Sequence, residues 1–229
     1  MLTVLLVLSI AFGCAKKYSE EKYEELIQEA KIKGEWDKAI KYCRDLIEYY
    51  PSSPKAQDHK LALADYLFKA AEKTEDKKKA ILYYSEAASV AAPADKLKVA
   101  QANYNIAKLL EPTDSLKAAT YYREIDKEQY DKMAQLYIAE ENYQDAINCY
   151  TKLIGFYPKD PSSYKWHFMM GFIYSEYLDE PDKAKEYFKN VYTKFPECEL
   201  ADDAKFLYEY AGEDVEEIIF RKAEENTTQ

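Results

Sequence analysis

A chain of 229 residues with 48% hydrophobic and 32% charged residues is long enough for one globular domain or one repeat array. Only five glycines and eight prolines interrupt it, and runs of Val, Ile and Thr are missing after residue 10, which favours helices joined by short turns over a β-rich fold. A formal net charge of −10 argues against nucleic acid as the principal partner, because phosphate backbones attract basic surfaces. We therefore expect an all-α protein.

The first predicted element is an uncharged apolar stretch over residues 2–12. It is shorter than the roughly 20 residues that a membrane-spanning helix needs, and its length is typical of the hydrophobic part of a secretory signal. The sequence AFGC that ends at Cys14 resembles the lipobox of bacterial lipoproteins, in which the chain is cut before a cysteine that carries the lipid. We therefore expect a signal peptide over residues 1–13, lipidation of Cys14 and a polar tether over residues 14–22. The alternatives are a cut without lipidation and a buried first helix with an ordinary thiol at Cys14.

Five helical segments farther along the chain share one pattern. Each begins with an alanine, and an aromatic residue or a cysteine follows three or four positions later on the same helix face. The segments recur at intervals of roughly 30 to 40 residues, a period typical of stacked helix pairs in which the small alanine lets two helices approach closely. Their alanines are Ala39, Ala80, Ala118, Ala146 and Ala184.

Two segments, residues 127–160 and 164–197, carry this pattern most fully. The first contains Ala134, Tyr137, Tyr143, Ala146, Tyr150 and Pro158, and the second contains Gly171, Tyr174, Ala184, Phe188 and Pro196. With weaker matches over residues 20–53, 61–93 and 99–126, this pattern resembles the tetratricopeptide repeat (TPR) family. The resemblance implies a right-handed α-solenoid of about five helix pairs.

The segment after the last repeat, ECELADDAKFL, predicts an amphipathic helix with Leu200, Ala204 and Leu207 on one face. Repeat arrays need such a terminal helix to cover their last apolar face. We therefore expect the array and its capping helix over residues 23–211, followed by a short helix and a polar tail over residues 212–229.

No arrangement of residues indicates a catalytic site, a metal site or a cofactor. The four cysteines include no Cys-x-x-Cys pair, and we expect Cys43 and Cys149 to be small buried residues within helices. His59 lies on a polar stretch and His167 lies among aromatic and methionine residues, and for each of them we expect a surface or packing role in place of a general base or metal ligand. The chain is therefore not expected to be an enzyme.

An aromatic cluster around Trp166 is the candidate for a partner-binding strip in the concave groove of the array. Three residues of the preceding unit are expected to face the same groove. Burial of the aromatic residues against the next helix is the alternative. The candidate partner-binding residues are Asp131, Gln135, Ile138, Trp166, Phe168 and Phe172, with Tyr177 at the end of the cluster.

The first repeat argues against one mode of binding that some TPR co-chaperones use. They grip a terminal carboxylate with Lys and Asn, whereas the matching positions here hold Glu24 and Gln28.

The sequence FPECELADDA, together with the lipobox, resembles envelope TPR lipoproteins. Examples are the TPR component of the outer-membrane β-barrel assembly machinery and the periplasmic coordinator of the Tol-Pal system. This resemblance implies a non-enzymatic scaffold at the outer membrane of a bacterial cell envelope, held on the periplasmic side by its lipid, with a protein or peptide in its concave groove. The alternatives are a soluble cytoplasmic adaptor and an accessory subunit of an envelope enzyme that acts on polysaccharide or peptidoglycan.

Overall fold

The computed structural model describes residues 18–92 and 94–213, and every regular element in these ranges is an α-helix. The all-α class predicted from the composition is confirmed. The helices are α1 (Glu20–Ile32), α2 (Trp36–Tyr49), α3 (Ala56–Lys73), α4 (Lys77–Ala91), α5 (Lys96–Leu110), α6 (Ser115–Arg123), α7 (Lys127–Ala139), α8 (Tyr143–Phe156), α9 (Ser163–Glu176), α10 (Pro181–Lys194) and α11 (Ala201–Tyr210).

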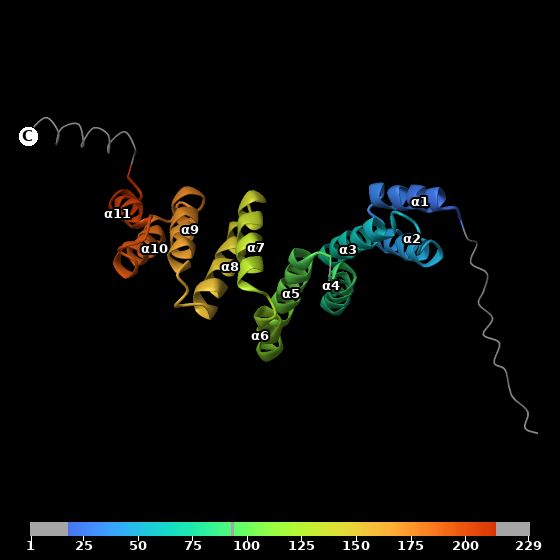
Figure 1. Ribbon diagram of the computed structural model, residues 1–229, viewed down its shortest axis with the longest axis horizontal. Coiled ribbons are helices and arrows are strands. Elements are labelled where there is room, and N and C mark those ends of the chain that lie inside the picture. The colour runs from blue at the N-terminus through green and yellow to red at the C-terminus, as the bar shows by residue number, and fades with distance from the viewer. Residues whose placement is uncertain (1–17, 93, 214–229) are drawn as a thin grey trace, which may run out of the picture. The chain divides into compact units, whose positions relative to one another are not determined.

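The described part of the chain divides into two compact units, with the boundary between residues 122 and 123. In the first unit each of the helices α1 to α4 packs against the next helix in the chain, and in the second unit the same holds for α7 to α10 (Figure 1). The rings of Tyr104 and Tyr122, with centroids 5.8 Å apart, join α5 to α6. Each unit is therefore a stack of helices in sequence order.

Three helix pairs share one turn geometry. The α1–α2, α7–α8 and α9–α10 turns each contain a residue with left-handed backbone, at Gly34 (φ 68°), Glu141 (φ 59°) and Asp179 (φ 50°). The amide that follows each of them donates to a carbonyl near the end of the preceding helix, at 2.8 to 2.9 Å. In the third pair this bond spans one residue more, from Glu180 to Tyr174, because the turn is one residue longer.

The same three pairs also end their second helix alike. The amides of Tyr50, Tyr157 and Phe195 each donate at 2.9 Å to the carbonyl four residues earlier. Two further backbone hydrogen bonds lie in the connection to the next helix, and equivalent bonds occur after each of the three pairs. The last of these connections leads into α11, which therefore takes the place of a following repeat.

The repeated alanines lie where the helices approach each other. All five have exposed fractions of at most 3%, and the residue four positions after each alanine is buried as well. Those following residues are Cys43, Tyr84, Tyr122, Tyr150 and Phe188. The alanine spacing in the sequence therefore marks the real helix contacts, and the predicted burial of Cys43 and Cys149 is confirmed.

Helix α11 covers the end of the second unit. Ala204 is fully buried, and Leu200 and Leu207 pack against the core cluster that contains Ala184 and Phe188 of α10. The three residues of the predicted apolar face thus contact one core. None of the helices in the described residues combines the length and apolarity needed to cross a membrane. The signal peptide, Cys14 and the helix predicted around residues 214–223 lie outside the described residues.

Candidate partner-binding groove

A groove of about 670 Å³ lies between α1 and α3 in the first unit. Residues of α1 at helical spacing form one wall, Ala62 and Tyr66 of α3 belong to the other, and Cys43 of α2 also lines it. Tyr23 and Ile27 are buried in the core that α1 shares with α2 and α3, so the polar residues of α1 are left beside the groove. The α1 residues that line the groove are Glu21, Glu24, Glu25, Ile27, Gln28, Glu29 and Ile32.

The charge of this groove is acidic. Four glutamates line it, and no lysine or arginine is among its described lining residues. Two neighbouring lysines compensate part of this charge, because Lys22 pairs with Glu25 at 2.7 Å and Lys55 pairs with Glu24 at 2.8 Å. Ile32, at the far end of α1, is 86% exposed and adds apolar surface. The groove therefore offers carboxylates beside an apolar wall.

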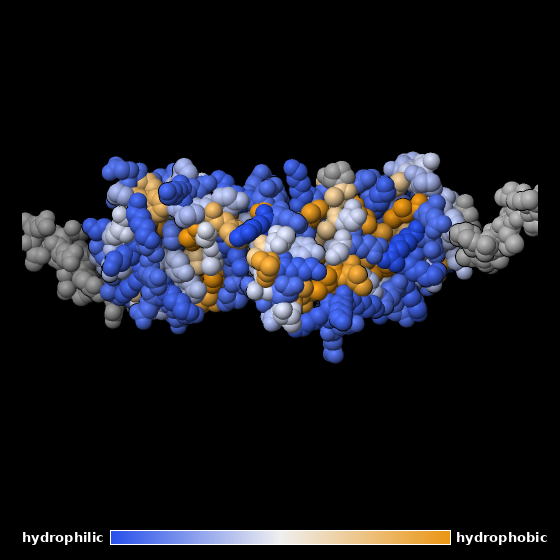
Figure 2. All heavy atoms as spheres, turned by 90° about the horizontal axis from the view of Figure 1, so that it is seen from below, coloured by the Kyte–Doolittle hydropathy of each residue, from blue (hydrophilic) through white to orange (hydrophobic). Residues whose placement is uncertain are grey.

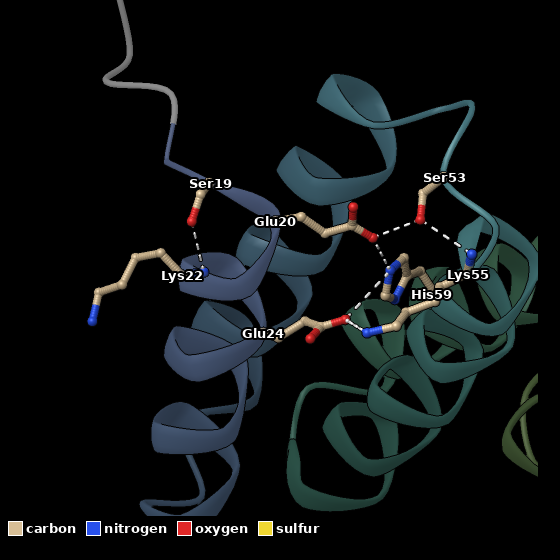
Figure 3. A network of polar contacts seen from close by, with 7 residues as sticks. All are labelled: Ser19, Glu20, Lys22, Glu24, Ser53, Lys55 and His59. Atoms are coloured by element: carbon tan, nitrogen blue, oxygen red, sulfur yellow. Dashed lines mark hydrogen bonds and ion pairs between the residues drawn. The ribbon is translucent and has the colours of Figure 1, made fainter.

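A polar network joins the start of α1 to α3, and two of its members, Glu24 and His59, line the groove (Figure 3). The Ser53 hydroxyl donates to Glu20 Oε1 at 2.6 Å, and His59 Nε2 lies 3.3 Å from the same oxygen. His59 Nε2 also lies 3.8 Å from Glu24 Oε1. The hydrogen bonds from Ser53 and His59 hold the pKa of the Glu20 carboxyl below its usual value. His59 therefore lies half-buried between α1 and α3, and not on the open surface that its polar neighbours in the sequence suggested.

Cys43, also at the groove, carries a thiol with no sign of activation. Its Sγ–H donates to the carbonyl of His59 at 3.3 Å, and burial raises its pKa to about 12. A thiolate is the reactive form of cysteine, so this side chain is an inert packing group. The groove is suited to binding, and its cysteine does not supply a nucleophile.

The second unit brings together three of the residues predicted to bind a partner. The Asp131 carboxylate on α7 accepts a hydrogen bond from Gln135 at 2.8 Å and another from Trp166 on α9. Trp166 is 3% exposed, and burial raises the pKa of the Asp131 carboxyl. Ile138 is half-buried on the same helix as Asp131. The predicted neighbourhood of α7 and α9 therefore exists, with Gln135 as its exposed member.

The predicted aromatic strip is divided between different neighbours. Phe168 packs edge-to-face on Phe188 of α10, with centroids 5.6 Å apart, and Phe172 lies edge-to-face against Tyr177 at 5.9 Å. Tyr177 also stacks on Tyr143 of α8 at 4.4 Å. Phe168 thus contacts the next helix, and partner binding by these residues stays a prediction.

His167 packs in the core of the second unit. It is 7% exposed, its ring lies beside those of Tyr187 and Phe195, and its Nδ1 atom has no hydrogen-bond partner. Burial lowers its pKa to about 4, so the ring is neutral at pH 7. Of the surface and packing roles expected for His167, the structure shows packing.

Polar side chains cover most of the face shown in Figure 2, and apolar side chains gather there in separate patches. Apolar side chains with large exposed fractions include Ile32, Leu82 and Leu116, all in the first unit. Exposed apolar residues of this kind are common on soluble surfaces and do not by themselves mark a site.

Comparison with protein families identifies the repeats. Residues 22–53 and 167–197 match one tetratricopeptide repeat profile, and residues 130–160 match a second one. The chain contains tetratricopeptide repeats. The three matched segments coincide with the three helix pairs that share the left-handed turn, one in the first unit and two in the second.

Solved structures similar to this chain include other repeat proteins. A crystal structure of MamA protein is 19% identical, covers 76% of this chain and 91% of its own, and has a TM-score of 0.33. A tetratricopeptide repeat protein from Parabacteroides merdae ATCC 43184 is 19% identical, with coverages of 82% and 73% and a TM-score of 0.34. A kinesin light chain with nearly identical TPR-like repeats from Podosopora anserina is 12% identical, with coverages of 78% and 96% and a TM-score of 0.32. No curated protein matches the chain.

Proposed function

We propose that this protein is a non-enzymatic scaffold of the bacterial cell envelope that holds a basic segment of a partner protein in the α1–α3 groove. TPR repeats imply a protein–protein interaction scaffold. The acidic lining of the groove is the observation that carries the proposal, since four glutamates line it and Lys55 and Lys22 pair with only two of them.

The chemistry of the groove defines the partner. Lysine or arginine side chains would face the glutamates of α1, while apolar side chains would contact Ala62 and Tyr66 of α3. An amphipathic helix or an extended segment can meet both requirements. Acidic segments would be rejected, because like charges across an interface are costly.

The location at the envelope rests on the lipobox that ends at Cys14. An acyl chain contributes about 0.8 kcal/mol per buried methylene, and stable anchoring requires two signals, such as two or more acyl chains. Bacterial lipoproteins meet this requirement, so a lipid on Cys14 would keep the repeats at a membrane. A role in outer-membrane protein assembly or in envelope organisation follows from the resemblance to envelope TPR lipoproteins.

Photocrosslinking from the groove in living cells, followed by measurement of affinity, tests the partner. A photoreactive residue at Gln28 is expected to capture a protein through a basic segment, whereas the same residue at the exposed Gln144 of α8 is not.

The captured segment, made as a peptide, should bind the double variant Glu21→Lys/Glu29→Lys at least about tenfold more weakly. The matched control Glu48→Lys/Glu75→Lys reverses two exposed charges of the same unit outside the groove and should bind normally. Equal affinity in both double variants would contradict the assignment to the groove.

Cell fractionation tests the anchor. The variant Cys14→Ser should leave the membrane fraction, and the control Cys198→Ser should remain in it. The intact mass of the native protein should show a cut before Cys14 and added acyl chains. A full-length, unmodified chain would support the cytoplasmic adaptor instead.

A further inference from the structure

Three side chains that commonly bind metals converge where α1 meets α3. Glu20 and Glu24 lie one turn apart on α1, and His59 approaches both from α3 (Figure 3). One potential ligand atom from each side chain lies within 4.8 Å of the other two. We infer that Glu20, Glu24 and His59 form a binding site for a divalent transition-metal ion, with Zn²⁺ as the best match.

The donor atoms favour zinc over the alkaline-earth ions. Calcium and magnesium take oxygen ligands, whereas zinc is regularly held by imidazole nitrogen together with carboxylate oxygen. Three protein ligands with a fourth position left to water is a common zinc arrangement. The two carboxylates would also balance the charge of the ion.

The spacing of the atoms is close to that of a zinc site. In a tetrahedral site with metal–ligand distances of about 2.0 to 2.1 Å, neighbouring ligand atoms are about 3.3 to 3.4 Å apart. His59 Nε2 lies 3.3 Å from Glu20 Oε1 and 3.8 Å from Glu24 Oε1. The side chains of Glu20 and Glu24 are 24% and 34% exposed, so small rotations of their carboxylates can complete the geometry. Metal binding would select the His59 tautomer with its proton on Nδ1, because Nε2 must supply a lone pair.

A neighbouring hydroxyl supports one of the ligands. Ser53 donates to Glu20 Oε1 at 2.6 Å from the turn between α2 and α3. Hydrogen bonds of this kind fix the direction of a carboxylate ligand and are a regular part of metal sites. The remaining lone pairs of Glu20 would stay available to the ion.

Lys55 is the natural competitor for the metal. Its ammonium group lies 2.8 Å from Glu24 Oε1, the oxygen that the site would use. The Lys55 side chain is 59% exposed and can swing into solvent. The metal and Lys55 therefore bind the same carboxylate alternately, which gives the proposal a specific consequence for affinity.

The site adjoins the groove, because Glu24 and His59 are also among the residues that line it. Ions can reach the three ligands through this opening, and a water molecule can fill the fourth position. The inference needs no partner protein, so its outcome is separate from that of the proposed groove function.

Zinc titration of the purified chain against a chromogenic chelator tests the site. The variants His59→Ala and Glu24→Gln should each weaken zinc binding by at least about tenfold. The control Glu21→Gln removes an exposed groove carboxylate on the same helix turn and should leave the affinity unchanged. Circular dichroism checks that His59→Ala is folded. Glu24→Gln changes a partly exposed side chain of α1 and gives a second test of zinc binding. Native affinity in both variants would overturn the proposal and assign any bound zinc to other residues, such as the cysteines.

The variant Lys55→Met is expected to change the zinc affinity in the opposite direction. It removes the competing ammonium group and should tighten zinc binding several-fold, which a purely structural polar network does not predict. No gain in affinity would overturn the placement of the ion on Glu24. Because the chain contains two histidines, NMR can also show which one responds. The ring signals of His59 should shift with zinc while those of the buried His167 stay in place, and the reverse would contradict the site.

Discussion

Phe188 of α10 lies so close to Gly171 of α9 that a β-carbon on Gly171 would be 2.7 Å from its Cε1 atom. Alanine normally stabilises a helix by about 1 kcal/mol relative to glycine. Here the added methyl group would displace a fully buried ring, so we expect Gly171→Ala to lower the free energy of unfolding by roughly 1 to 3 kcal/mol. Chemical denaturation measures this change.

Gly155 of α8 is the matched control, because apart from its chain neighbours and its own helix backbone no atom lies within 4 Å of the place where its β-carbon would be. Gly155→Ala should be neutral or stabilise the protein by up to about 1 kcal/mol. A stabilising effect at both glycines would show that Phe188 yields at no cost. Phe188→Leu should recover part of the loss in a Gly171→Ala background, because it removes the atoms that clash.

The left-handed turn residue Glu141 is expected to carry strain. Its φ of 59° matches that of Gly34 in the first pair, but a side chain makes this conformation unfavourable by roughly 1 to 2 kcal/mol. We therefore expect Glu141→Gly to raise the free energy of unfolding by up to about 1 kcal/mol, part of the gain being lost to the greater freedom of the unfolded chain. Thermal unfolding measures it. The neighbouring Glu140, with φ −89°, serves as the control, and Glu140→Gly should destabilise.

The buried alanines of the repeats set the distance between paired helices. Ala146 and Ala184 are fully buried, so a leucine at either position should overpack the pair and cost about 1 to 3 kcal/mol. Ala139→Leu, on the exposed end of α7, should change stability by less than about 0.5 kcal/mol. An unchanged melting temperature in Ala146→Leu would contradict the repeat register.

Because His167 is buried with a lowered pKa, we expect the protein to lose stability on mild acidification. Its pKa is about 4 in the folded protein and 6.5 ordinarily, so between these values the unfolded chain binds a proton that the folded chain does not. The stabilising contribution is complete above pH 6.5 and is lost as the pH falls to about 4. The total change should be of the order of 3 kcal/mol, from about 1.4 kcal/mol for each pH unit between the two values.

The measurement compares the native chain with His167→Phe at pH 7 and pH 4.5. Carboxylates also titrate in this range, so the difference between the two proteins isolates the histidine. Trp166 lies beside His167 and reports on the second unit by fluorescence once the other tryptophan is replaced, as in Trp36→Phe. Parallel pH profiles of the two proteins would contradict the prediction.

The repeat architecture could be predicted because its signals are local in the sequence. Alanine and the aromatic residue four positions later lie on one helix face, so their contact with the next helix follows from spacing alone. Gly171 also matched the family pattern, and the structure gives the reason in the ring of Phe188 beside it.

The sites were harder to predict, because they depend on how one helix face meets another. Glu20 and His59 come together from α1 and α3, and His59 looked like a surface residue between Asp58 and Lys60. An i, i+4 pair of glutamates was the available signal, and it is common on solvated helices. The angle between helices, which no short motif encodes, decides such contacts.

The aromatic strip shows the same limit within one helix. Trp166 and Phe168 are two positions apart, which places them on nearly opposite faces of a helix. Trp166 accordingly reaches Asp131 of α7, while Phe168 reaches Phe188 of α10. The composition of the cluster was visible in the sequence, and its division between two neighbours was not.

The order of helix packing has a consequence for the folding of the protein during its synthesis on the ribosome. Each helix from α1 to α4, and again from α7 to α10, packs on the one that follows it in the chain. Contacts between sequence neighbours close small loops and form quickly. Within each of these two series, a nascent chain can therefore begin to bury a helix as soon as the next one emerges from the ribosome.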